Sequence, residues 1–310
     1  MALTAARFAE RPLAAYNAVV AALWLTTAHG PLAALLGAAH LAAATLPWLF
    51  RAAPPRRATN LLRDLYPLLL VPALWIEMDL LHRAQAAPLH DAALAALDLG
   101  LFGAHWNLLW MPAMPVRWLS ELMQALYFGY YPAVFGAPLL LLFAGRRAGA
   151  RELIQRLTIT AIGCSLVYVF FPAAGPAITL PQYSGPLTDG FFYRLNHAAH
   201  EAGDAVGTAF PSSHVAYAVT MAIAARRCCP RWAAALLAAE AVGVCFAVVY
   251  TQNHYPIDAV AGVALTAALQ LGLVPALQRA GRSAPRRAVA ARYDTPFPPS
   301  PAPAVTGGGA

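Results

Sequence analysis

Long apolar runs constrain the fold of this chain more than any other feature. A helix needs about 20 apolar residues to cross the hydrocarbon core of a bilayer. Runs of roughly that length occupy residues 12–28, 31–50, 65–83, 118–144, 153–172, 209–226, 232–250 and 256–277. Lipid-facing backbone must be hydrogen-bonded internally, and these runs are too long and too weakly alternating for barrel strands. The sequence therefore predicts an all-α polytopic membrane protein with about eight transmembrane helices.

The arginines predict how the chain is oriented in the membrane. All 21 basic residues are arginine, and with both termini in the cytoplasm only Arg83, Arg117 and Arg194 fall on the outer side. This asymmetry is what the positive-inside rule requires. The net charge of +7 thus follows the loops, and we expect no nucleic-acid partner. High alanine and arginine content without lysine indicates a GC-rich bacterial genome, so we expect an inner-membrane protein whose outer face is periplasmic.

The spacing of the runs predicts three parts. Residues 1–59 are expected to form an amino-terminal transmembrane hairpin with a basic linker, and residues 60–278 a six-helix catalytic membrane domain. Residues 279–310, rich in Pro, Ala and Arg, are expected to be a disordered cytoplasmic tail. On the outer side, residues 90–115 predict one or two interfacial helices. The Gly- and Pro-rich segment 173–207 predicts an ordered loop without a helix.

Two polar motifs stand at the outer ends of apolar runs. "PSSH" ends at His214, and "HYPID" places His254 four residues before Asp258. That spacing puts a carboxylate beside an imidazole, where it can hold one ring nitrogen protonated and leave the other free as a nucleophile. A single interfacial histidine is usually a headgroup contact. Two histidine motifs on one side of the membrane, one with serines and one with a carboxylate, favour a catalytic site.

These motifs resemble the type 2 phosphatidic acid phosphatase superfamily, whose members carry P-S-G-H and S-R-x5-H-x3-D. "PSSH" matches the first except that Ser213 replaces glycine, and the second matches in its H-x3-D half. The resemblance implies a phosphohistidine mechanism without metal or other cofactor. His254 would attack phosphorus, Asp258 would orient it, and His214 would protonate the leaving alkoxide and then deprotonate the acceptor.

The chain departs from the superfamily pattern where phosphate charge is bound. The K-x6-R-P motif is absent because the chain has no lysine, and Ala247 and Val248 stand where the S-R pair would be. We therefore expect phosphate to be bound by serines, by N–H groups at a helix start and by an outer arginine. The expected phosphate-binding residues are Ser212, Ser213, Arg117 and Arg194.

One branch of the superfamily is more similar than the rest. "FPSSH" with "HYPIDAVAG" looks like the branch of the fungal inositol phosphorylceramide synthases and their bacterial relatives, and "GD" at 203–204 and "FPAAGPA" also resemble it. The resemblance implies an inositolphosphotransferase that moves a phospho-headgroup from a phospholipid donor to a lipid hydroxyl, as in sphingolipid metabolism. With water as acceptor, the same residues would make a phosphatase acting on phosphatidic acid or isoprenyl diphosphate. The motifs leave this choice open, and they do not predict the oligomeric state.

A transporter and an inactive scaffold are the competing hypotheses. Acidic side chains in or near spans are costly unless they are paired or functional, and the chain has them at Asp64, Glu77, Asp79, Glu121 and Glu240. Transporter sites lie near the bilayer midplane within repeats. Here no inverted repeat is visible, and the histidines gather at one face. The transporter is therefore less favoured than an enzyme, and the presence of all three of His214, His254 and Asp258 argues against the inactive scaffold.

Overall fold

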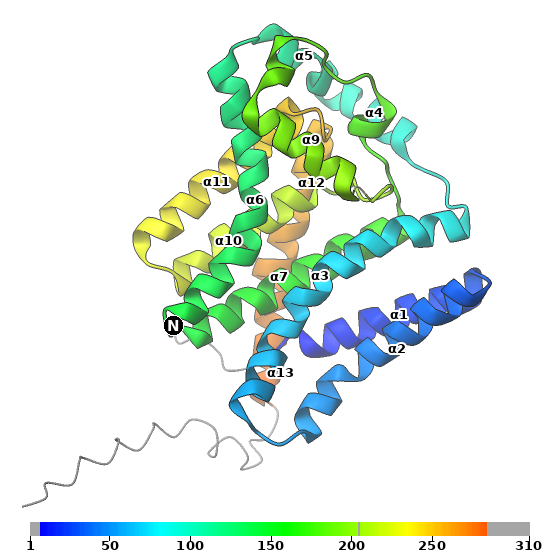
Figure 1. The fold of residues 1–310 in the computed structure, drawn as a ribbon, viewed down its shortest axis with the longest axis vertical. Coiled ribbons are helices and arrows are strands. Elements are labelled where there is room, and N and C mark those ends of the chain that lie inside the picture. The colour runs from blue at the N-terminus through cyan, green and yellow to red at the C-terminus, as the bar shows by residue number, and fades with distance from the viewer. Residues whose placement is uncertain (1–6, 204, 284–310) are drawn as a thin grey trace, which may run out of the picture.

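The computed structural model describes residues 7–203 and 205–283, and this part of the chain is helical almost throughout (Figure 1). Its long helices are α1 (Glu10–Thr27), α2 (Pro31–Ala52), α3 (Arg57–Gln85), α6 (Arg117–Phe143), α7 (Arg147–Phe170), α10 (Ser213–Cys228), α11 (Arg231–Tyr250) and α12 (Pro256–Ala267). α12 continues through a π-helical turn, η2 (Ala268–Leu273), into α13 (Val274–Ser283). The described residues contain no strand, only an isolated bridge between Ala173 and Thr208. The predicted all-α class is confirmed.

Helices form at all eight predicted apolar runs. Six of them are long and apolar enough to cross a membrane, namely α2, α3, α6, α7, α11 and the continuous helix Pro256–Gly281. α10 is too short for that test, at 16 residues, and α1, at 18 residues, is not apolar enough. The short helices α4 (Asp91–Phe102) and α5 (Trp106–Ala113) meet at a bend of 61° and together would make a seventh span. The chain is thus an integral membrane protein with several spans.

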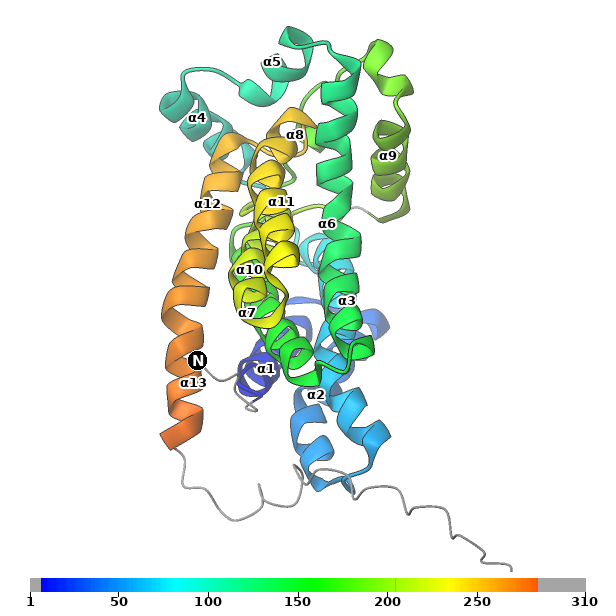
Figure 2. The same cartoon turned by 90° about the vertical axis from the view of Figure 1, so that its left-hand side faces the viewer.

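The bundle has two distinct ends. α3 and α7 begin at the same end, where Arg147 and Arg151 of α7 donate to Asp64 of α3. They also finish together, since the ring Nε2 of His82 lies 3.0 Å from the carbonyl oxygen of Tyr168. We call the first the arginine end and the second the loop end. The loop end carries α4, α5 and α9 (Figure 1), and α10 runs inside the bundle between α7 and α11 (Figure 2).

The segment 173–207 at the loop end differs from its prediction. It was expected to lack helices, but it contains α8 (Pro176–Thr179), a 3-10 turn η1 (Pro186–Asp189) and the 13-residue helix α9 (Phe191–Gly203). α9 packs on α6, where Glu121 accepts the N–H of Phe192 at 3.1 Å and Asn196 donates to the carbonyl of Gln124 at 2.9 Å. The prediction was wrong because these stabilising contacts come from a helix about 70 residues away. The segment 90–115 forms helices α4 and α5.

The first two helices form an antiparallel pair beside α3 (Figure 1). Glu77 of α3 accepts the indole N–H of Trp24 from α1 and lies 2.6 Å from the ring Nε2 of His40 on α2. Asn17 of α1 lies 2.8 Å from the other ring nitrogen of His40. A buried polar network therefore joins the hairpin to the bundle. Of the predicted tail, residues 279–283 are helical, and the remainder lies outside the described residues.

Candidate active site

The two polar motifs meet at the loop end, at the starts of α10 and α12. Ser212 is the N-cap of α10, and its backbone N–H donates to the carbonyl oxygen of Asp258 at 3.0 Å. The helices approach closely because residue 262 is glycine. A Cβ atom on Gly262 would lie 2.7 Å from the carbonyl oxygen of Ser212 and 3.2 Å from Cβ of Val215. One backbone hydrogen bond and one glycine thus hold the two motifs together.

His254 and Asp258 form the pair that their spacing predicts. The ring Nδ1 of His254 lies 3.3 Å from Oδ2 of Asp258, which also accepts the N–H of Tyr255 at 2.9 Å. Asp258 is completely buried, and its Oδ1 has no hydrogen-bond partner among the described residues. A proton on Nδ1 directed at this carboxylate leaves the lone pair of Nε2 for nucleophilic attack. α4 fixes the start of α12, since Asp98 accepts the N–H of Ile257 at 2.9 Å.

His214 lies in a cage of tyrosine rings from α6. Its ring centroid is 4.4 Å from those of Tyr127 and Tyr130 and 5.6 Å from that of Tyr131. Its Nε2 lies 3.4 Å from the hydroxyl of Tyr131, and its Nδ1 has no hydrogen-bond partner in the described structure. The ring centroid of His254 is 6.0 Å away. A reacting group between the two rings could contact both, as a shared nucleophile and acid–base pair requires.

A small cavity of about 50 Å³ opens where the two histidines face each other. It is lined by His214, His254, Ser213 and Thr208, with Tyr127 and Trp75 closing its sides. It adjoins a larger polar hollow of about 290 Å³ that shares Ala177 and His200 with it. We call the larger hollow the vestibule.

Amide side chains dominate the vestibule. Gln124, Gln182, Asn196 and Asn253 line it together with Tyr193. Asn196 donates to Oε1 of Gln124 at 2.7 Å. Burial raises the pKa of the Tyr193 phenol above its ordinary value, so this group stays neutral and able to donate. The vestibule thus offers neutral hydrogen-bonding groups next to the histidines, together with His197 and Glu201, whose Nε2 and Oε1 atoms lie 3.3 Å apart.

Comparison with known families shows which superfamily the chain belongs to. A model described as the PAP2 superfamily matches residues 92–271, more than half of the chain. The chain belongs to the PAP2 superfamily. No curated protein and no solved structure matches the chain. The PAP2 superfamily comprises phosphatases and phosphotransferases. Both histidine motifs of this chain fall inside the matched range.

The part of the chain before the PAP2 match also contributes to the site. Trp75 of α3 lines the cavity. His82, on the same helix, has its Nδ1 3.1 Å from the carbonyl oxygen of Val206 and so contacts the loop that leads into "PSSH". Gly207 in that loop has φ +96, and a Cβ there would collide with the ring of His82. α3 therefore forms a wall of the candidate site although it precedes the matched residues.

The predicted phosphate-binding residues lie in different places. Ser213 lines the cavity, whereas Ser212 is fully buried and caps α10 by accepting the N–H of Val215 at 3.5 Å. Arg117 and Arg194 are exposed, at the start of α6 and on α9, and neither is among the residues that line the cavity. Phosphate binding by these two arginines stays a prediction. Within the described residues, the cavity wall of this PAP2 protein contains no arginine.

Sequence reasoning missed the aromatic and amide residues around the PAP2 motifs. The tyrosine cage comes from "YFGYY" at 127–131, an aromatic group of residues inside an apolar run. Its concentration of phenols was the available signal. Trp75, His82 and Asn196 had no such signal, because their proximity to the histidines depends on how distant helices pack.

Proposed function

We propose that the chain is a lipid phosphotransferase or phosphatase that works through a phosphohistidine on His254. The observation that carries the proposal is the small cavity in which His254, backed by the buried carboxylate of Asp258, faces His214. The ring of His254 has a carboxylate partner, as suits a nucleophile. The other has an unpartnered Nδ1 and a polar Nε2 contact, which suit a group that gives and takes protons.

In the first step, Nε2 of His254 attacks phosphorus and the bond from phosphorus to the leaving oxygen breaks. His214 gives its proton to that oxygen, so the leaving group departs as a neutral alcohol. In the second step His214 takes the proton of an acceptor hydroxyl, whose oxygen attacks phosphorus while the P–N bond breaks. The Ser213 hydroxyl and the backbone N–H groups of Ser213 and His214 supply hydrogen bonds to the phosphate oxygens, since of the first-turn N–H groups only that of Val215 is capped by Ser212.

Within this mechanism we propose an inositolphosphotransferase, with a phospholipid donor and a lipid hydroxyl as acceptor. The amide-rich vestibule supports it, because amides and neutral phenols can hydrogen-bond the hydroxyl groups of an uncharged polyol headgroup. The face that carries the site would be periplasmic in a bacterial inner membrane, with both termini in the cytoplasm.

Hydrolysis is the second candidate, because the vestibule is polar and adjoins the cavity, so that water can reach the phosphohistidine. The substrate would then be phosphatidic acid or isoprenyl diphosphate.

The acidic residues of α3 do not support a transport function. Glu77 has Trp24 and His40 as partners, and Asp64 has arginines, so both are held by internal contacts.

The test uses purified full-length protein with labelled phosphatidylinositol or phosphatidic acid, with and without ceramide or diacylglycerol. Acceptor-dependent appearance of a labelled second lipid is the expected result, and release of free phosphate without acceptor would establish the phosphatase instead. His254→Ala should lower the rate by on the order of 10³-fold or more. His29→Ala, at an exposed site between α1 and α2, is the control and should keep the wild-type rate. Full activity in His254→Ala would overturn the phosphohistidine.

A further inference from the structure

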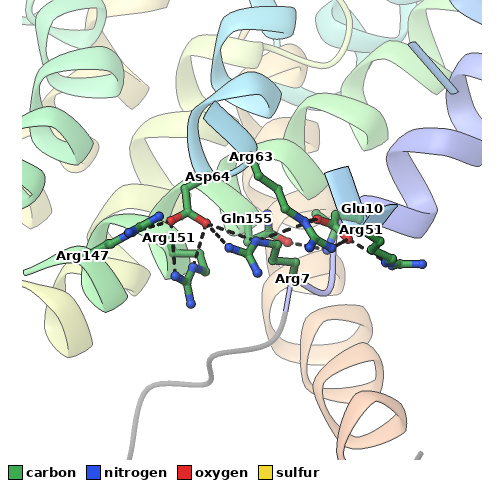
Figure 3. Close-up of polar contacts among 9 residues, drawn as sticks. Arg7, Glu10, Arg51, Arg63, Asp64, Arg147, Arg151 and Gln155 are labelled. Carbon is green, nitrogen blue, oxygen red and sulfur yellow. Dashed lines mark hydrogen bonds and ion pairs between the residues drawn. The ribbon is translucent and has the colours of Figure 1, made fainter. Parts of the chain in front are cut away.

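A cluster of arginines at the arginine end lies around two buried carboxylates (Figure 3). The acids are Glu10 and Asp64, whose side chains are each 1% exposed. The arginines are Arg7, Arg51, Arg63, Arg147 and Arg151. They come from the segment before α1 and from α2, α3 and α7, so the cluster gathers residues far apart in the sequence.

Asp64 is saturated with donors. Its Oδ1 accepts from Arg7 at 2.8 and 3.1 Å and from Nε of Arg151 at 2.9 Å. Its Oδ2 accepts from Nε of Arg147 at 2.7 Å and from Nη2 of Arg151 at 3.2 Å. A carboxylate has about four lone-pair sites. Asp64 therefore has no capacity left for the further N–H groups of Arg7 and Arg147.

The carboxylate of Glu10 also accepts several hydrogen bonds from arginines. It accepts two bonds from Arg63, at 2.6 and 2.8 Å, and one from Arg51 at 3.0 Å. Nε of Arg7 lies 3.9 Å away and connects the two halves of the cluster. In these ion pairs the positive charges exceed the negative ones by three. Nη2 of Arg147 is buried without an acceptor among the described residues.

The surroundings of the cluster are apolar and exposed. Trp48 and Leu49 precede Arg51 and are 54% and 59% exposed, and Leu61 and Leu62 precede Arg63 and are 41% and 55% exposed. Apart from Arg7 and Glu10, which lie just before and at the start of α1, the cluster residues lie near the ends of the candidate spans α2, α3 and α7. Side chains at this depth face headgroups, and their apolar neighbours face acyl chains. A ligand that binds here therefore contacts both the positively charged arginines and the hydrocarbon of the bilayer.

We propose that this arginine cluster binds the phosphate group of an anionic membrane lipid. A phosphate supplies several acceptor oxygens with negative charge, and guanidinium groups match that geometry. The site is separate from the histidines. Asp64 and His82 lie on one helix, 18 positions apart, which corresponds to about 27 Å at 1.5 Å per residue. The lipid is thus bound in the opposite leaflet from the catalytic cavity.

The experiment measures lipid binding to the full-length protein in nanodiscs of phosphatidylcholine with and without phosphatidylglycerol. Thermal unfolding and native mass spectrometry report stabilisation and retained lipid. Wild-type protein should be stabilised by phosphatidylglycerol, and Arg147→Gln and Arg51→Gln should each weaken its binding by about tenfold. Arg231→Gln, at an exposed position at the start of α11, is the matched control and should bind like wild type.

Three outcomes would overturn the proposal. Equal losses in Arg147→Gln and Arg231→Gln would show attraction to general positive charge rather than a site. Unchanged binding in both cluster variants would remove the cluster as the site. Full displacement of the lipid by inorganic phosphate would identify a soluble anion as the ligand. Lipid turnover should be unchanged in Arg147→Gln and Arg51→Gln, which separates lipid binding from the catalytic site. Each variant removes one donor from a buried carboxylate, so its stabilisation by phosphatidylglycerol is measured relative to its own unfolding midpoint in phosphatidylcholine alone.

Discussion

The two histidines of the site have opposite surroundings. His254 has a buried carboxylate 3.3 Å from its Nδ1, whereas the ring of His214 packs among tyrosines. A carboxylate that accepts the Nδ1 proton fixes the tautomer and the orientation of the ring, while an aromatic cage holds a ring in place without fixing its proton. This difference supports the proposed roles more directly than the sequence motifs do, because both motifs contain a histidine beside polar residues.

The tyrosine cage leads to a test by substitution. Tyr130→Phe keeps the ring that packs at 4.4 Å from His214, so the rate should stay within about threefold of wild type. Tyr130→Leu removes the flat surface and lets the imidazole reorient, and displacing a catalytic group by about 1 Å can cost roughly 10²-fold. The measurement is kcat for lipid turnover in both variants. Equal rates in the two variants would show that the ring does not position His214.

At the scale of elements, the contact between α10 and α12 depends on a glycine. In Gly262→Ala the added Cβ meets backbone and side-chain atoms of α10 at 2.7 and 3.2 Å. The helices must separate, and we expect the free energy of unfolding to fall by about 1–3 kcal/mol, with a loss of activity. Gly272→Ala in η2 is the control, since nothing lies within 4 Å of its new Cβ. Activity retained in Gly262→Ala would show that the two motifs tolerate separation.

The contact between the amino-terminal hairpin and α3 depends on Glu77. Replacing it by leucine leaves the buried His40 ring and the indole of Trp24 without their acceptor. We expect the free energy of unfolding to fall by about 3–5 kcal/mol, measured by denaturant titration in detergent. Asp79→Asn on the same helix is the control. Asp79 pairs with Arg83, whose side chain is 73% exposed, so this change should cost less than about 1 kcal/mol.

At the scale of the whole molecule, the two ends of the bundle should lie on opposite sides of the membrane. His29 belongs to the loop end, because Thr27 just before it accepts a hydrogen bond from Gln85 at the end of α3, at 2.9 Å. Arg56 precedes α3 and belongs to the arginine end. In cells, a membrane-impermeant thiol reagent should label His29→Cys directly and Arg56→Cys only after permeabilisation. The wild-type protein supplies the background from its own cysteines. The reverse pattern would invert the proposed orientation.

The sequence predicted the parts of this molecule that depend on local pattern. Apolar runs located the helices, and the four-residue spacing of His254 and Asp258 predicted their contact. Packing between distant helices lay beyond such patterns. α9 was missed because its partners are Glu121 and Gln124 of α6, and the tyrosine cage was missed because the same rings suit lipid contact equally well. Arg117 and Arg194 were expected to bind phosphate only because they fall on the outer side of the membrane. That criterion does not specify where in the bundle a side chain lies.

The hydrogen bond from Ser212 to the carbonyl of Asp258 has a mechanical consequence. A thicker or thinner bilayer tilts and shifts the outer helices of a membrane protein to match its hydrophobic thickness. The helices that carry the two histidines are joined by this bond at the point where both begin. We therefore expect a change of lipid chain length to move the proposed nucleophile and the proposed proton donor together, so that membrane thickness affects substrate access through the surrounding helices before it affects the distance between the two histidines.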